Sequence, residues 1–149
     1  MSNFYGQYIG FGGGGAVAAR TDAVWYGTRG IYAGGFVYPS EPWSNSMQYI
    51  TIGSTGNSAD FADLTLGRRE VVSLSDGTIG VSAGGTGDGH PSSDVMDYVT
   101  IGTVGGDALD FGNMTTIRSS INGAISDVAG TGLFPAGYCE GAACVAVDI

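Results

Sequence analysis

The sequence predicts an all-β protein built from about three repeats of about 50 residues each, and three observations support this. A phrase occurs twice, as YITIGSTGNSADFADLTLGR at 49–68 and YVTIGTVGGDALDFGNMTTIR at 98–118, with ten identical positions if one residue near Leu109 is an insertion. Tyr and β-branched residues form short runs between Gly and polar residues, which is typical of strands, and no helical period interrupts them. Gly accounts for 28 residues and charged side chains for 13%, whereas 43% is hydrophobic, a composition that suits closely spaced strands.

The whole chain, 1–149, is expected to be a single repeat domain whose units are about 20–67, 68–117 and 118–149. The N-terminal segment 1–19 contains the Gly-rich run YIGFGGGG and should complete or cap the array. The first unit begins at Arg20 and continues with AVWY, GTRGIYAGG, a variable polar loop and the strand YITI.

The second unit repeats this order from Arg68, with VVSLS, GTIGVSAGG, a polar loop and YVTI. The nine-residue segments GTRGIYAGG and GTIGVSAGG agree at six positions. The third unit begins at Arg118, and GAISDVAG provides a weaker match to the Gly-containing segment. AACVAVDI at 142–149 could be the strand that corresponds to YVTI.

Four short strands per unit of about 50 residues are typical of a propeller blade. The Gly-Gly pair suits a strand near the crowded axis of such a fold, where backbones approach closely. About three blades are fewer than the four of the smallest usual propeller. Either the chain closes a small ring, with the N-terminal segment completing the last blade, or subunits cover the open faces. A homo-oligomer is therefore expected.

The order Arg, apolar strand, Gly-Gly, loop, Asp-x-x-Asp-Tyr strand, aromatic strand, Arg resembles the kelch repeat over residues 20–118. SDVMDYVTI at 93–101 is the nearest local match, whereas Phe61 and Phe111 stand where kelch blades usually carry Trp. The repeated phrase is also similar to degenerate blade repeats in structural proteins of marine tailed phages and cyanophages. This resemblance implies a small or incomplete β-propeller-like array and a place in a virion.

The charge distribution disfavours binding to nucleic acids and to anionic membranes. The chain has 14 acidic residues, five Arg and no Lys, which gives a net charge of −9. A nucleic-acid backbone or an anionic lipid surface requires clustered basic residues. The N-terminal region has no basic stretch followed by an apolar core, so we expect neither a signal peptide nor a membrane span.

His90, the single histidine, lies in a polar loop with Asp88, Ser92, Ser93 and Asp94. These residue types permit a Ser-His-Asp triad, but no G-x-S-x-G turn is present, so a solvated loop is favoured. Some kelch-like propellers are copper oxidases, whose sites need paired imidazoles that one His cannot supply. We therefore expect no catalytic residue and no enzyme activity.

Acidic residues recur beside the aromatic strand and around the His90 loop, at Asp60, Asp63, Asp107, Asp110, Asp88, Asp94 and Asp97. Calcium prefers such oxygen ligands, but the EF-hand pattern is absent and turn or strand-end roles are common for Asp. GFGGGG at 10–15 lacks the Lys and Ser/Thr of a phosphate loop. We expect no metal and no cofactor.

Four residues are candidates for interaction rather than for chemistry. Tyr38 and Trp43 lie in the loop YPSEPWSN, where they could anchor a partner, stack on a glycan, or pack over the end of a blade. Cys139 and Cys144 lie in CEGAAC and could form a small disulfide loop or remain thiols, with a reduced pair favoured.

The equivalent arginines Arg68 and Arg118, with Arg20 approximately so, are expected to join blades by pairing with acids such as Asp60 or Asp110. Anion binding is the alternative. The resemblance to phage blade repeats, with the missing catalytic set, the few charges and the incomplete array, favours a virion structural protein that acts through contacts with major capsid or tail proteins, most simply a capsid decoration protein. A tail or fibre component and a glycan-binding receptor module are the alternatives.

Overall fold

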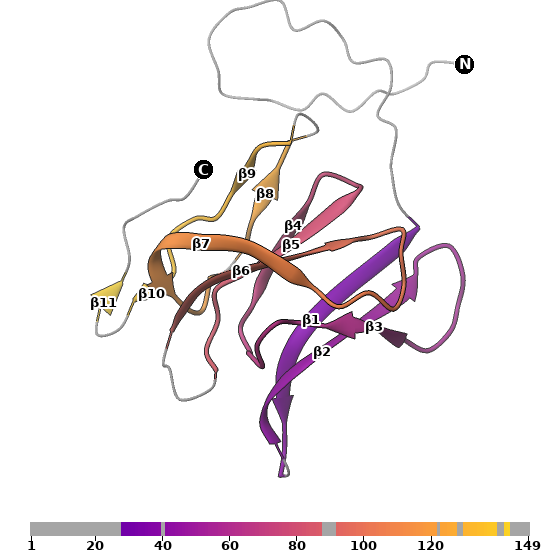
Figure 1. Ribbon diagram of the computed structural model, residues 1–149, viewed down its shortest axis with the longest axis horizontal. Helices are drawn as coiled ribbons and strands as arrows, with labels where there is room; N and C mark the ends of the chain where they lie inside the picture. Colours follow the sequence, from indigo (N-terminus) through magenta and orange to yellow (C-terminus); the bar gives the residue numbers. More distant parts are fainter. Residues whose placement is uncertain are drawn as a thin grey trace, which may run out of the picture.

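The computed structural model describes residues 28–39, 41–87, 92–121, 123–127, 130–139 and 142–143. Within these ranges the chain forms eleven strands and no helix, so the all-β prediction is confirmed. The strands are grouped in four antiparallel sheets of two to four strands (Figure 1). The segment 1–19, Arg20, His90 and Cys144 lie outside the described residues.

The first sheet is an antiparallel meander in the order β1-β2-β3. Its strands are β1 (Arg29–Val37), β2 (Glu41–Thr51) and β3 (Ala59–Asp63). All three lie within the predicted unit 20–67. The predicted strand YITI falls at the end of β2, and the Gly-Gly pair falls in β1, where the register with β2 shifts.

The second sheet is a four-stranded meander in the order β4-β5-β6-β7. Its strands are β4 (Val72–Ser75), β5 (Ile79–Ala83), β6 (Ser93–Thr100) and β7 (Leu109–Arg118). They span almost the whole of the predicted unit 68–117. The hairpin between β4 and β5 turns at Asp76, whose Oδ1 accepts the N–H groups of Thr78 and Ile79 at 2.7 and 2.8 Å.

The third unit contributes two short hairpins to the described structure. One pairs β8 (Ile125–Ser126) with β9 (Gly132–Leu133), and the other pairs β10 (Tyr138–Cys139) with β11 (Ala142–Ala143). The pairing Ile125↔Leu133 corresponds to Leu74↔Val81 in the second sheet. The hairpin β8–β9 is therefore the counterpart of β4–β5.

The strands of the first two sheets pair in equivalent registers. Met47 lies opposite Ala33 and Met96 lies opposite Ala83, so the central strands of both sheets pair in the same way. The bulge that follows each Met occurs at the same place, where β2 pairs with β3 and β6 pairs with β7. The repeat in the sequence is thus a repeat in the hydrogen-bonding pattern.

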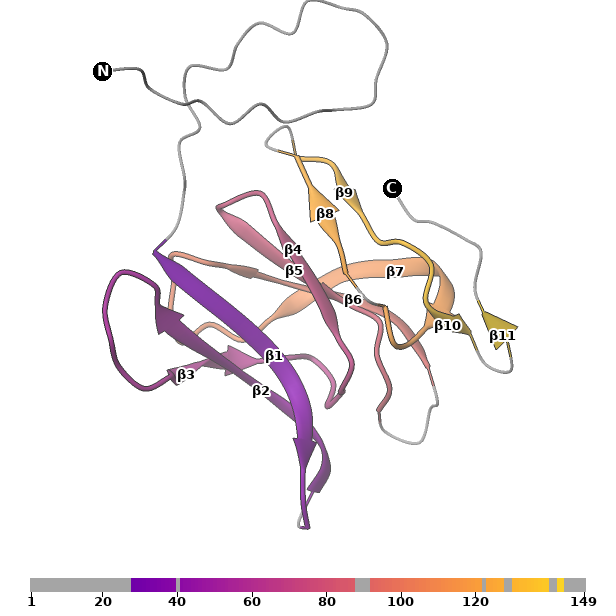
Figure 2. The ribbon, with the colours of Figure 1, turned by 180° about the vertical axis from the view of Figure 1, so that it is seen from behind.

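The units are arranged in a stack, with the first sheet, the second sheet and the hairpin β8–β9 following one another (Figures 1 and 2). We call the side of a unit that faces the next unit its front face, and the opposite side its rear face. One buried cluster joins the front face of the first sheet to the second unit, and it includes Met47, Phe61, Leu64, Val99 and Ala108. A second cluster joins the second sheet to the third unit, and it includes Val81, Met114, Ile121 and Phe134. In the described part of the chain these sheets do not close into a barrel or a propeller.

Gly is required where consecutive units meet. Gly34 has φ +69°, and a Cβ there would lie 2.1 Å from the carbonyl oxygen of Arg68. Gly84, its counterpart, has φ +66°, and a Cβ there would lie 2.9 Å from the carbonyl oxygen of Arg118. The next residue in each pair, Gly35 or Gly85, donates its N–H to the same carbonyl at 2.8 or 2.9 Å. The repeated Gly-Gly pair therefore serves the joints between units.

Candidate functional site

Exposed apolar side chains gather where β1 turns into β2. We call this group, Phe36, Val37, Tyr38 and Trp43, the aromatic tip. Tyr38 is 84% exposed, and Phe36 and Val37 are about half exposed. Trp43 is less exposed, because it packs edge-to-face against Phe36 with 6.0 Å between ring centroids and an interplanar angle of 73°.

Arg69, from the start of the second unit, lies against the aromatic tip. Its guanidinium carbon is 4.9 Å from the centroid of the Trp43 ring and 5.6 Å from that of Phe36. Such cation–π contacts contribute about 0.5–1 kcal/mol each at exposed sites. The tip is thus held by a side chain from the neighbouring unit.

Glu70 links the same region to the third unit. Its Oε1 lies 3.8 Å from Nε of Arg69, and its Oε2 accepts the hydroxyl of Ser120 at 2.8 Å. The backbone of Arg69 is also fixed, because Arg69 and Thr86 exchange two N–H···O bonds of 2.9 and 2.8 Å. These contacts give the tip a preformed shape, which lowers the entropy lost when a partner binds.

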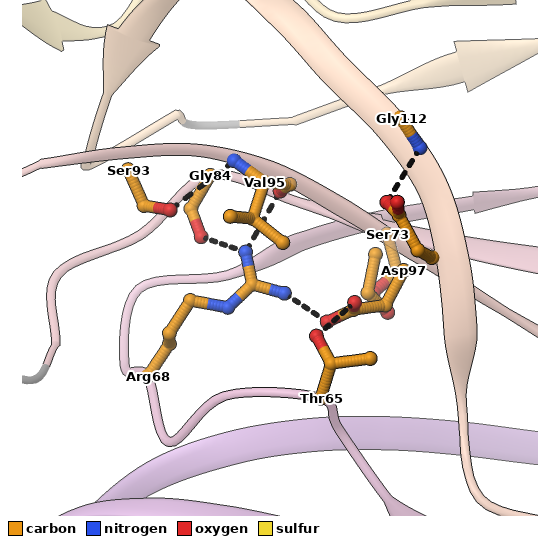
Figure 3. A network of polar contacts seen from close by, with 10 residues as sticks. Thr65, Arg68, Ser73, Gly84, Ser93, Val95, Asp97 and Gly112 are labelled. Carbon is orange, nitrogen blue, oxygen red and sulfur yellow. Dashed lines mark hydrogen bonds and ion pairs between the residues drawn. The ribbon is translucent and has the colours of Figure 1, made fainter.

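The second candidate site is polar and lies inside the stack, at the joint between the first and second units (Figure 3). Arg68 is fully buried and pairs with the buried carboxylate of Asp97 on β6. Its Nη1 donates to the carbonyl oxygens of Gly84 and Val95, both at 2.8 Å. Thr65 donates its hydroxyl to the other carboxylate oxygen of Asp97.

The charge of Arg68 is therefore matched within the protein. Burial lowers the pKa of Arg68 below its ordinary value, while the Asp97 carboxylate acts in the opposite direction. Arginine nevertheless stays protonated at physiological pH. The enclosed guanidinium ties the start of the second unit to β6 and to Gly84, and it offers no surface to a ligand.

Arg118 repeats the arrangement at the next joint. Its Nη1 donates to the carbonyl oxygens of Phe134 and Pro135, each at 3.3 Å. The bond from Arg68 to Gly84 and the bond from Arg118 to Phe134 both span 16 residues. The structural role expected for these arginines agrees with this geometry.

The expected partners of Arg68 were wrong. Its acidic partner is Asp97, not Asp60 or Asp110. Asp110 instead accepts the N–H of Gly112 at 2.9 Å, in the turn of the backbone at the bulge of β7. Asp60 lies on β3 and is exposed.

The other sequence candidates fall in different places. Tyr38 and Trp43 both belong to the aromatic tip, whereas Cys139 is far along the chain, on β10. Cys139 is disulfide-bonded, in contrast to the reduced pair that the sequence favoured. Sequence reasoning missed Arg69, although the Arg-Arg pair at the unit boundary was a usable signal. In the described ranges no three His, Cys, Asp or Glu side chains gather as metal ligands. Nor do those ranges contain a helix long and apolar enough to cross a membrane.

No protein-family model matches the chain, and neither does any curated protein.

Proposed function

We propose that this chain is a structural protein of a virus particle, located in the virion, and that it most simply decorates a capsid. Its partners would be a major capsid or tail protein and further copies of itself. We also propose that each meander of the stack is one blade of a small, kelch-like array. The protein would act by contact and not by catalysis.

The aromatic tip is the observation that carries this proposal. Large contiguous apolar patches on the surface of a soluble protein often mark a site of contact with a partner. Here Phe36, Val37 and Tyr38 are exposed together, and Arg69 holds the ring of Trp43 behind them. Aromatic and Arg side chains are the residue types that carry most of the energy of protein interfaces.

A glycan-binding role is the second candidate, and Tyr38 favours it. A ring that is 84% exposed can stack on a sugar. The Trp43 ring offers less, because Phe36 and Arg69 already pack against it. A glycan would therefore meet one free ring here, so contact with a protein is the better supported function. A tail or fibre position would use the same surface.

The experiment is to locate the protein in particles. Antibodies against the purified chain are applied to particles separated on a density gradient, followed by gold labelling in the electron microscope. The proposal expects the protein to sediment with intact particles and the label to lie on their shell. A protein found wholly in the soluble cell fraction would contradict it, and binding of labelled sugars that Tyr38→Ala abolishes would favour the glycan alternative.

A further inference from the structure

The two joints of the stack are filled to different degrees. At the first joint Phe61 of β3 is fully buried in a cluster with Val99 and Ala108 of the second unit. The N–H of Gly105 also donates to the Phe61 carbonyl at 2.8 Å. At the second joint Phe111 of β7 occupies the equivalent position and remains more than half exposed.

An open groove of about 630 Å³ lies beside Phe111, between the second sheet and the hairpin β8–β9. Apolar side chains of the second sheet line it, including Ile79, Val81 and Met96. The comparable space at the first joint measures about 270 Å³ and is lined in part by Val99 and Ile101. At the first joint the second unit contributes Val99 of β6 and Ala108, which directly precedes β7. At the second joint the described part of the third unit contributes β8–β9, the counterpart of β4–β5.

The opposite end of the stack carries an exposed surface that corresponds to the rear face of the second sheet. Ile50 and Ile52, on the rear face of the first sheet, are 42% and 56% exposed. Gly30 lies beside both, just as Gly80 lies beside Val99 and Ile101 in the second sheet. The rear face that the second sheet buries is thus left open in the first.

The N-terminal segment repeats the sequence of the strand that fills the first joint. QYIGFG at 7–12 agrees with QYITIG at 48–53 in four of six positions, and DYVTIG at 97–102 is the third member. Ile9 and Phe11 stand where the other two members have the apolar rear-face residues. An extended segment of this kind can add to the free edge of a sheet and place alternate side chains in pockets.

We propose that residues 7–20 of a second copy of this chain bind in the open groove, next to β9, with Ile9 and Phe11 packed on Phe111. The rear face of that second copy, at Ile50 and Ile52, would then cover Ile125 of β8, which is 66% exposed. A second copy is chosen because the second sheet separates the groove from the first sheet, to which residues 7–20 are joined.

This contact joins two different surfaces of the chain, so successive copies form a ring or a filament. The inference rests on the proposed function, for which it names one partner. Because each copy offers one donor segment and one acceptor groove, blocking either end leaves the other intact. That asymmetry makes the inference testable with mixtures of variants.

The test uses full-length protein and light scattering over a range of concentrations. Wild type should exceed the monomer mass of 15.1 kDa, and the excess should grow with concentration. The donor-blocked variant Ile9→Asp with Phe11→Asp and the acceptor-blocked variant Phe111→Asp should each remain monomers. Mixed in equal amounts, they should form a dimer and nothing larger, because one intact donor meets one intact groove.

Tyr38→Asp is the matched control, since it places an acid on an exposed aromatic position away from the groove. It should assemble like wild type. Whether it still joins particles tests the proposed function separately, because the proposed function expects it to join them less well than wild type. A wild type that stays monomeric at every concentration would overturn the inference. So would a mixture that stays monomeric although both variants keep the wild-type circular dichroism. If Phe111→Asp does not fold, Phe111→Ser takes its place with the same expected mixing result.

Discussion

Phe61 and Phe111 make the same contact in two consecutive sheets, yet one is 0% exposed and the other 53%. Each packs edge-to-face against a tyrosine, Tyr49 or Tyr98, with 6.0 Å between ring centroids and interplanar angles of 72° and 68°. The local structure of the repeat is thus preserved, and the environment of the ring depends on what the next unit brings to the joint.

We predict that the same substitution has different costs at these two positions. Phe61→Ala removes a fully buried ring and leaves a cavity, which costs about 3–5 kcal/mol of unfolding free energy. Phe111→Ala removes a ring that is already half in water and should cost about 1 kcal/mol. Urea unfolding of both variants at one dilute concentration provides the comparison. Equal costs would mean that Phe111 is covered in solution.

The burial of Phe61 could not have been read from the sequence, because both phenylalanines stand in the same phrase. What the repeated segments did predict was the strand type, the order of the segments and the recurring Gly-Gly pair. These follow from local rules, such as β-branched runs and the backbone freedom of Gly. Burial depends on contacts between units, and a repeat that looks the same in sequence meets a different neighbour at each joint.

The buried pair of Arg68 and Asp97 gives the second prediction. Asp97→Asn keeps the shape of the side chain but leaves the guanidinium buried without its counter-charge, so we expect a loss of about 3–5 kcal/mol. The matched control is Gln48→Ala, at the corresponding position of the first sheet, where Gln48 Oε1 accepts the hydroxyls of Tyr32 and Ser58 at 2.6 and 2.7 Å.

Those bonds of Gln48 are exposed to water, so the control should lose about 1 kcal/mol or less. Thermal and urea unfolding of both variants measure the difference. An Asp97→Asn variant as stable as the control would show that the backbone carbonyls of Gly84 and Val95 suffice to hold the Arg68 charge.

The partner of Arg68 was missed for a specific reason. Asp97 corresponds to Gln48 in the first sheet, so the acid does not recur at this position of the first two sheets and the sequence repeat gives no sign of it. The sequence pointed to Asp60 and Asp110 because those acids do recur. The aromatic tip was found in part, since Tyr38 and Trp43 stand in a proline-containing loop. Arg69, which packs against the tip, comes from the adjoining unit, and only the stacking of units brings it there.

Gly34 provides a prediction about the joint itself. Gly34→Ala forces a side chain into a left-handed backbone conformation and against the Arg68 carbonyl, so it should destabilise the fold by about 2–4 kcal/mol. Gly53→Ala is the control, because a Cβ at Gly53 meets nothing within 4 Å. Urea midpoints for the two variants decide the matter, and a tolerated Gly34→Ala would mean that the units can separate without loss of stability.

The turn at Asp76 makes a prediction about acid. The N–H groups of Ile79 and Thr78 hold the pKa of the Asp76 carboxyl below its ordinary value, because they favour the charged form. A group with a lowered folded-state pKa contributes stability above its unfolded pKa of about 3.9, and this contribution is lost as pH falls through the folded value. Asp76→Ala should therefore be less stable than wild type above about pH 5, and the difference should shrink below about pH 4.

Unfolding curves at several pH values test this, with Asp107→Ala as a variant that removes one charge from the exposed loop between β6 and β7. The control matches the change in net charge, so any effect common to both variants reflects general charge repulsion. A difference between Asp76→Ala and wild type that does not change with pH would mean that the turn does not depend on the ionised carboxylate.

The aromatic tip separates stability from binding. Trp43→Ala removes the contact with Phe36 and the cation–π contact with Arg69, so it should lower the unfolding free energy by about 1–2 kcal/mol. Tyr38→Ala removes a side chain that is almost entirely in water and should leave the unfolding free energy within about 0.5 kcal/mol of wild type. If the tip contacts a particle shell, both variants should bind more weakly than wild type to particles from which this protein has been removed, as measured by sedimentation. Loss of binding in Tyr38→Ala, with unchanged stability, would assign the effect to the surface itself, whereas full binding by both variants would remove the tip from the proposed contact.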